Sequence, residues 1–230
     1  MLNIKLVLFK IKNFLIIIKS RLLKKKISLR YRENKIKFEK LIENKSFSHK
    51  WFLNNFEIFA HYLPKELSKD FSYLEIGSFE GLSALNILSN YPNSKVTVID
   101  LWSESNINSE SLDVNFTEIE KKFDENLKGY NFSKIKKDSV IALRELLKKK
   151  ISFDFIYIDG SHNGEDILSD AIESYKLLNT GGLIIFDDVV NTNKNISIQS
   201  YKGFEKFCEI FNERLKILYL KNIAVVKKIK

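Results

Sequence analysis

The chain has a single cysteine, Cys208, among its 230 residues. One thiol cannot form an internal disulfide, a cysteine-based zinc site or a three-cysteine iron–sulfur cluster, and this excludes radical chemistry on such a cluster. The scarcity of cysteine also fits a reducing compartment. We therefore expect a cytoplasmic protein.

Long hydrophobic runs and early small residues are also missing. The longest N-terminal stretch without a charged or polar residue is 14–18, far short of the ~20 apolar residues that span a bilayer. Alanine, a usual residue at signal-peptide cleavage sites, first occurs at Ala60. We expect neither a membrane-spanning helix nor export.

Acidic residues are scarce in only one part of the chain. Residues 1–50 hold 15 Lys and Arg against three Glu, a balance of +12, so residues 51–230 sum to −3 within the total of +9. A nucleic-acid-binding domain would carry its basic residues on the folded body. We therefore expect no nucleic-acid partner.

The basic leader has the periodicity of a helix, and we assign residues 1–45 to a basic amphipathic extension and 46–230 to one domain. In one interpretation the helix packs on the domain or on a second subunit, as in a homodimer. In the other, residues 1–30 lie on an anionic membrane at its inner face, where each basic residue contributes roughly 1 kcal/mol. The apolar stripe comprises Ile4, Val7, Leu8, Ile11, Phe14, Leu15, Ile18 and Leu22.

Strand and helix patterns alternate through the rest of the chain, after an aromatic-rich helix at 51–62. This alternation predicts an α/β fold: a doubly wound, Rossmann-like, mostly parallel seven-stranded sheet with helices on both faces. The last two strands are joined by two residues and must form a C-terminal antiparallel hairpin. Strands are expected at 73–76, 96–99, near 135, 153–158, 183–186, 215–220 and 223–228, and helices at 83–89, 117–127, 139–148, 165–178 and 201–211.

Two glycines follow the first strand in the pattern E-x-G-x-x-x-G, from Glu75 through Gly77 to Gly81. Ligands of an open parallel sheet bind beyond the carboxyl ends of its strands, where glycine lets the backbone approach and a helix N-terminus offers free N–H groups. Phe79 breaks the G-x-G-x-x-G pattern that seats a pyrophosphate. The spacing favours an amino-acid tail without phosphate, and a tight turn without a ligand is the alternative.

Polar residues also follow the second and third strands. Asp100 ends the second strand, where a carboxylate can accept both hydroxyls of a ribose in a bidentate bond. Asp138 and Ser139 follow the third strand and could meet an adenine. An N-cap role explains Asp138 equally well.

Three aspartates end the fourth and fifth strands: Asp159, Asp187 and Asp188. If these strands are neighbours, the carboxylates would repel one another unless a divalent cation such as Mg²⁺ neutralised them. Such a metal could hold an acceptor hydroxyl and lower its pKa, and His162 could take the proton. Alternatively, Asp159 supports the donor, Asp187 or Asp188 caps a loop, and His162 caps the following helix. His49 and His61 lie outside these strand ends and are expected to be structural.

At these residues the chain resembles the methyltransferase-24 type of class I S-adenosylmethionine-dependent methyltransferases. Its members read like E-I-G-S-x-E-G-x-S-A, then I-D, then F-D-x-I-Y-I-D-G-S-H, then G-G-x-I-x-F-D-D, and the resemblance runs from about Trp51 to the C-terminus. More distantly, the chain is similar to catechol and sugar O-methyltransferases. The resemblance implies S-adenosylmethionine as the methyl donor, and a hydroxyl of a small molecule or saccharide as the acceptor.

The resemblance also implies roles for matching residues. Catechol enzymes carry Lys where this chain has His162 and Asn where it has Asp188, and sugar enzymes often carry a second Asp where it has Ser161. These departures concern the proton acceptor, for which we name His162 with Asp159, and leave the donor side unchanged. The metal ligands are expected to be Asp159, Asp187 and Asp188, and the donor residues Glu75, Gly77, Ser78, Phe79, Gly81, Ser83, Asp100, Leu101, Asp138, Ser139 and Asp159.

Two other function classes compete with methyl transfer. The missing third glycine disfavours a nicotinamide-dependent oxidoreductase, and intact Glu75, Gly77, Asp100 and Asp159 disfavour a scaffold that has lost its chemistry. No N/D-P-P-Y-type loop for a flipped base follows the fourth strand, which disfavours nucleic-acid methylation. The acceptor stays unnamed because its walls are expected from the loops 103–115 and 189–200.

Overall fold

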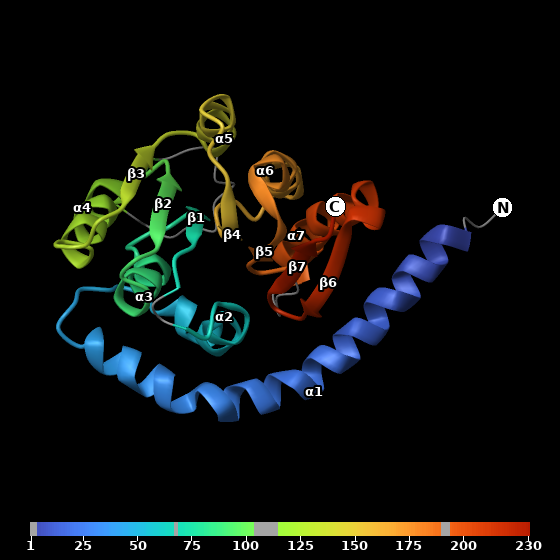
Figure 1. The fold of residues 1–230 in the computed structure, drawn as a ribbon, viewed down its shortest axis with the longest axis horizontal. Coiled ribbons are helices and arrows are strands. Elements are labelled where there is room, and N and C mark those ends of the chain that lie inside the picture. Colours follow the sequence, from blue (N-terminus) through green and yellow to red (C-terminus); the bar gives the residue numbers. More distant parts are fainter. Residues whose placement is uncertain (1–3, 67–68, 104–114, 190–193) are drawn as a thin grey trace.

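The computed structural model describes residues 4–66, 69–103, 115–189 and 194–230, with the backbone alone at 4–12 and 194–198. A seven-stranded sheet runs through this part of the chain in the order β3-β2-β1-β4-β5-β7-β6 (Figure 1). In this order, each neighbouring pair of strands from β3 through β5 is parallel, and β7 pairs antiparallel with both β5 and β6. The predicted fold class is therefore confirmed. The strands are β1 Ser72–Ile76, β2 Lys95–Asp100, β3 Ser133–Lys136, β4 Phe153–Ile158, β5 Leu178–Phe186, β6 Leu215–Leu220 and β7 Ala224–Lys228.

The helices follow the predicted order with three differences. The segment at 51–62 divides at Asn55 into a 3₁₀ turn and a short helix. The last long helix begins seven residues before the predicted position 201, and β5 begins at Leu178 where a helix end was predicted. The helices are α1 Ile4–Leu41, η1 Trp51–Asn54, α2 Phe56–Tyr62, α3 Leu82–Asn90, α4 Phe116–Asn126, α5 Ser139–Lys148, α6 Gly164–Leu177, α7 Lys194–Ile210 and η2 Asn212–Arg214.

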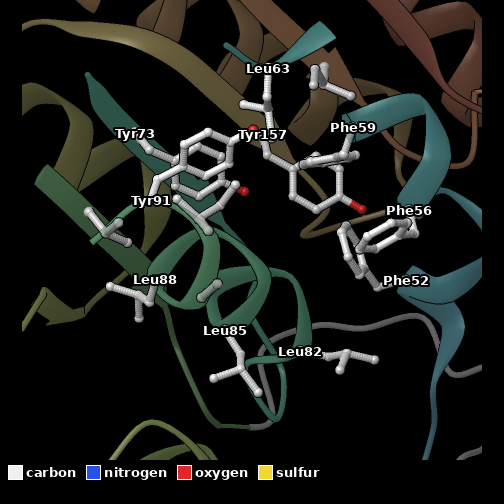
Figure 2. Close-up of a cluster of buried hydrophobic side chains, with 14 of the residues drawn as sticks. Phe52, Phe56, Phe59, Leu63, Tyr73, Leu82, Leu85, Leu88, Tyr91 and Tyr157 are labelled. Carbon is white, nitrogen blue, oxygen red and sulfur yellow. The ribbon is translucent and has the colours of Figure 1, made fainter. Parts of the chain in front are cut away.

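Two hydrophobic clusters fill the two faces of the sheet, because successive strand residues point to opposite sides. Tyr73 and Tyr157 face the cluster under α1 to α4, whereas Leu74 and Ile156 face the cluster under α5 to α7. Figure 2 shows the first cluster, in which the ring of Phe59 on α2 packs edge to face against the ring of Tyr157, with 4.7 Å between the ring centroids. The strand ends that carry the aspartates are thereby fixed against α2.

The long helix α1 packs along the domain and contributes to the first cluster. Ile27, Tyr31, Phe38 and Ile42 are buried with the aromatic residues of η1 and α2. Ser20 is buried as well, and its hydroxyl accepts the N–H of Leu220 at 2.9 Å, which satisfies a backbone donor of the edge strand β6. Within the described ranges, no helix is long and apolar enough to cross a membrane.

The buried face of α1 is not the predicted apolar stripe. The side chains of Phe14, Leu15, Ile18 and Leu22 are 62%, 52%, 41% and 70% exposed. The stripe therefore faces away from the domain. The opposite face is buried because it carries Ser20, which binds a backbone N–H group of the edge strand β6, together with apolar residues that join the first cluster. Its earlier members, Ile4, Val7, Leu8 and Ile11, lie outside the residues whose side chains are described.

Candidate active site

The strand order reverses between β1 and β4, and the loops that follow these two strands meet there. Gly77 has φ +79°, and a Cβ at this position would lie 2.3 Å from the carbonyl oxygen of Asp159 and 2.5 Å from Cα of Gly160. Only glycine fits both the left-handed conformation and this close approach. The loop 77–81 joins β1 to α3, and we call it the glycine loop. It therefore rests directly on the end of β4.

Glu75 organises this loop from beneath. Its side chain is fully buried on β1 and accepts hydrogen bonds from the hydroxyls of Tyr73, Ser78 and Ser83, at 2.7, 2.5 and 2.7 Å. Burial raises the pKa of Glu75 although these three donors oppose the shift. The predicted donor residues Ser78 and Ser83 thus direct their hydroxyl protons to Glu75.

Asp100 holds the loop from the end of β2. One carboxylate oxygen, Oδ2, accepts the backbone N–H groups of Ser78 and Phe79 at 2.7 and 2.9 Å, and Oδ1 accepts that of Trp102 at 2.9 Å. A carboxylate offers about four acceptor sites, so the contacts with described residues leave one site open, on Oδ1. A ribose hydroxyl can bind there, whereas the predicted bidentate bond would require one backbone contact to be replaced. Leu101, the next residue, is partly exposed beside it.

Two residues of the loop region have strained backbones. Phe79 and Trp102 have φ +51° and +42°, and the indole N–H of Trp102 donates to the carbonyl of Phe79 at 2.9 Å. Such conformations cost about 1–3 kcal/mol each and persist where surrounding contacts impose them. Trp51 covers the loop from outside, with its ring 5.5 Å from that of Phe79.

A buried carboxylate joins the segment after α1 to the same loop. Glu80 is 2% exposed and accepts both the backbone N–H and the hydroxyl of Ser48, at 2.6 and 2.7 Å. Lys122 lies 3.1 Å from it and balances its charge. The glycine loop is thereby fixed on three sides, by Glu75, Asp100 and Glu80.

The third strand leads to the N-terminus of α5, where the capping role of Asp138 is present: its carboxylate accepts the N–H of Ile141 at 3.1 Å. Ser139 is partly buried and its hydroxyl is hydrogen-bonded to Asp170 of α6. Asp170 is 3% exposed, and its Oδ1 has no hydrogen-bond partner among the described residues. Ser139, which was predicted to meet the adenine, is therefore held by the buried carboxyl group of Asp170.

Asp159 and Asp187 lie side by side because β4 and β5 pair in parallel, which was the condition for the predicted approach of these carboxylates. The hydroxyl of Tyr157 joins them, at 2.9 Å from Asp159 and 2.5 Å from Asp187. A hydroxyl has one proton to donate, so the second contact requires a proton on a carboxyl group. Burial and the charge of Asp187 raise the pKa of Asp159, while burial and the charge of Asp188 raise that of Asp187 to about 6.

The predicted magnesium ligands do not surround one point. Both oxygens of Asp187 are occupied by contacts within the protein: the side-chain nitrogen of Asn55 donates at 2.8 and 3.1 Å, the backbone N–H of Asp188 donates at 2.8 Å, and the Tyr157 hydroxyl lies 2.5 Å away. In the described part of the chain, no group of three or more His, Cys, Asp or Glu side chains is placed to hold a metal. In this arrangement the three aspartates do not fit a divalent cation, because each oxygen of Asp187 is already hydrogen-bonded within the protein.

His162 lies on the loop after β4, with its side chain 43% exposed and its Nε2 3.9 Å from Oδ2 of Asp188. It does not cap α6, because Asn163 occupies that position and accepts the N–H of Glu165. An accessible imidazole beside a carboxylate can take a proton from an acceptor hydroxyl. The predicted role of His162 as a base is thus compatible with its position.

Several contributors to the site were not predicted from the sequence. Tyr157 lies two residues before Asp159 and so faces the same side of the sheet, a relation that the strand period could have revealed. Asn55 is 132 residues from Asp187 along the chain, and no local pattern connects them. Glu80 lay within the recognised motif but resembled an exposed loop residue.

Known proteins are similar to this chain in sequence or in fold. A family model for a methyltransferase domain, of the methyltransferase-24 type, matches residues 74–189, half of the chain. An uncharacterized protein of Acanthamoeba polyphaga mimivirus is 30% identical over 127 residues, which are 52% of this chain and 52% of that protein. The chain therefore spans about half the length of this curated relative.

Three solved structures illustrate the fold. The mycinamycin-pathway methyltransferase MycE, in complex with Mg and S-adenosylhomocysteine, is 17% identical with a TM-score of 0.53, covering 89% of this chain and 54% of its own. A calicheamicin methyltransferase is 13% identical with a TM-score of 0.51, covering 86% and 92%. The O-methyltransferase TomG of Streptomyces achromogenes is 17% identical with a TM-score of 0.51, covering 69% and 73%.

The matched residues 74–189 contain the glycine loop, Asp100 and the aspartates at the ends of β4 and β5. The sheet is mostly parallel and ends in the antiparallel C-terminal pair that was predicted. This chain belongs to the methyltransferase-24 family of S-adenosylmethionine-dependent methyltransferases.

Proposed function

We propose that the chain transfers the methyl group of S-adenosylmethionine to a hydroxyl of a small molecule or a saccharide. The observation that carries the proposal is the glycine loop, which Gly77 seats on the end of β4 and Asp100 holds through the backbone N–H groups of Ser78 and Phe79. A loop fixed in this way beside the point of strand reversal matches a donor with an amino-acid end and a ribose. The O-methyltransferase named above supports oxygen as the acceptor atom.

In this proposal the donor lies across loop 77–81, with its ribose on the free acceptor site of Asp100 and its adenine near Ser139. The acceptor lies at the ends of β4 and β5, beside Asp159 and His162. Its hydroxyl oxygen attacks the methyl carbon in line with the sulfonium, the carbon–sulfur bond breaks, and S-adenosylhomocysteine leaves as the neutral thioether. The hydroxyl proton passes to Nε2 of His162, and the Asp188 carboxylate stabilises the imidazolium.

Magnesium dependence stays a prediction from the sequence, and the proposed proton and methyl transfers involve only protein residues, donor and acceptor. An ion at Asp187 would have to displace Asn55 and Tyr157 from its carboxylate. The acceptor also stays open, because most of the loops predicted to form its walls, 103–115 and 189–200, lie outside the described residues.

Thermal unfolding with ligands tests the class of cofactor. S-Adenosylhomocysteine is expected to raise the melting temperature of the full chain, whereas NAD is expected to leave it unchanged, because Phe79 stands where a pyrophosphate loop needs glycine. Stabilisation by NAD alone would favour the oxidoreductase. Stabilisation by neither ligand would favour a non-catalytic scaffold.

Asp100→Ala is expected to weaken S-adenosylhomocysteine binding by tenfold or more, on the order of the 1.5–3 kcal/mol of a hydrogen bond to a charged group. It also leaves three backbone N–H groups without their acceptor, so we expect lower stability as well. Glu80→Gln is the matched control, because it loosens the same loop through Ser48 from the side away from the donor. Equal losses of affinity in calorimetric titrations of both variants would mean that loop order alone, and no ribose contact, explains the effect.

A further inference from the structure

The outer face of α1 carries a line of exposed apolar side chains. Each buried residue of this helix named above lies two positions from an exposed one, which is about 200° around an α-helix. Ser20 lies between Ile18 and Leu22, Tyr31 follows Leu29, and Phe38 follows Ile36. Isolated exposed apolar residues are common on soluble proteins, but several of them along one face of a helix indicate an interaction surface. The line consists of Phe14, Leu15, Ile18, Leu22, Leu29 and Ile36, which are 41% to 70% exposed.

Unpaired basic residues flank this line. Residues 1–32 contain ten Lys and Arg and no acidic residue, since the first carboxylate of the chain is Glu33. The exposed residues Lys19, Arg21, Lys25 and Lys26 make no ion pair with the described part of the chain. The occupant of this face therefore has to be apolar in its interior and negatively charged at its surface.

The extent and position of α1 leave this face accessible. The helix has 38 residues and is therefore about 57 Å long at 1.5 Å per residue. Figure 1 shows it curving around the outside of the domain, with its N-terminal part continuing past β6. Its inner face is held by Ser20 and the buried core residues, so the helix need not detach from the domain to expose the apolar line.

We propose that the outer face of α1, residues 14–30, docks on an anionic phospholipid surface. The apolar side chains enter the boundary between headgroups and acyl chains, and the basic side chains contact the phosphate and carboxylate groups of the lipids. A second copy of the chain is the competing occupant. A two-fold contact would place the same patch on both subunits and bring their lysines together, which disfavours it.

Co-sedimentation of the full chain with vesicles tests this proposal. Binding is expected to vesicles of equal parts phosphatidylcholine and phosphatidylserine, at least tenfold weaker binding to phosphatidylcholine alone, and weaker binding in high salt. The double variant Ile18→Glu/Leu22→Glu is expected to bind roughly tenfold or more weakly. Ile210→Glu, at an equally exposed apolar residue at the end of α7, is expected to bind as the unchanged chain does.

A second measurement separates lost docking from lost folding. An environment-sensitive fluorescent dye is attached to the variant Leu22→Cys, and its emission maximum is expected to shift to shorter wavelength when phosphatidylserine vesicles are added. Cys208 is buried and does not compete for the label. Absence of binding by the unchanged chain, or equal binding by the folded double variant, would overturn the proposal. A third result would also overturn it: light scattering shows that the unchanged chain is a dimer and the double variant a monomer, and neither protein binds vesicles. The face would then be a subunit contact.

Discussion

Gly77→Ala is expected to lower the free energy of unfolding by about 2–5 kcal/mol and to abolish S-adenosylhomocysteine binding. The new Cβ would meet the carbonyl oxygen of Asp159 at 2.3 Å and Cα of Gly160 at 2.5 Å, both backbone atoms of the neighbouring strand end. Overpacking costs about 1–3 kcal/mol and a left-handed alanine about 1–2 kcal/mol more. The loop could accept the methyl group only by leaving β4, which would move the proposed donor site with it.

Gly181→Ala separates these two contributions. Gly181 has φ +87° and nothing within 4 Å of a Cβ built on it, so its replacement should cost only the strain of about 1–2 kcal/mol. Urea unfolding of both variants measures the difference. Equal losses would show that the loop after β1 does not rest on the end of β4.

Asp170→Asn is expected to make the protein more stable than the unchanged chain at pH 8, by a margin that disappears near pH 4. Burial, followed by the nearby carboxylates Asp166 and Asp138, raises the pKa of Asp170 to about 7, although the hydrogen bond from Ser139 opposes the shift. A raised carboxyl pKa contributes stability that is complete below the unfolded value and is lost as pH rises to the folded one. The loss therefore occurs between about pH 4 and pH 7 and is on the order of 4 kcal/mol, since each unit of pKa shift corresponds to about 1.4 kcal/mol.

Glu173→Gln, one turn further along α6, is the matched control with the opposite sign. Burial alone would raise the pKa of Glu173, but Lys176 and Arg144 lower it. Glu173 should therefore contribute stability above its ordinary pKa and lose it as pH falls. Denaturant unfolding of both variants between pH 4 and pH 8 tests the pair. A constant difference between Asp170→Asn and the unchanged chain would show that Asp170 does not retain its proton in the folded state.

The donor side of the site could be predicted because it depends on the order of residues along single strands. A glycine directly after β1 and an aspartate at the end of β2 must lie at the carboxyl edge of a parallel sheet, whichever loops surround them. What the sequence did not reveal at Asp100 is how many of its acceptor sites the protein itself uses.

The acceptor side was less predictable because it depends on contacts between distant segments. Three adjacent aspartates predicted a cation, but Asn55 of the segment before α2 and Tyr157 of β4 occupy the carboxylate oxygens of Asp187. Which face of α1 packs on the domain could not be predicted, for a related reason. Periodicity identifies where apolar residues gather, whereas the domain buries Ser20 at a strand edge and leaves Leu22 exposed.

Calorimetric titration of S-adenosylhomocysteine into the purified full chain, with and without Mg²⁺, tests whether loop 77–81 and Asp100 form a methyl-donor site. We expect one site per chain with micromolar affinity, reached without added metal. No heat of binding in either condition, from a chain that unfolds cooperatively, would contradict this assignment.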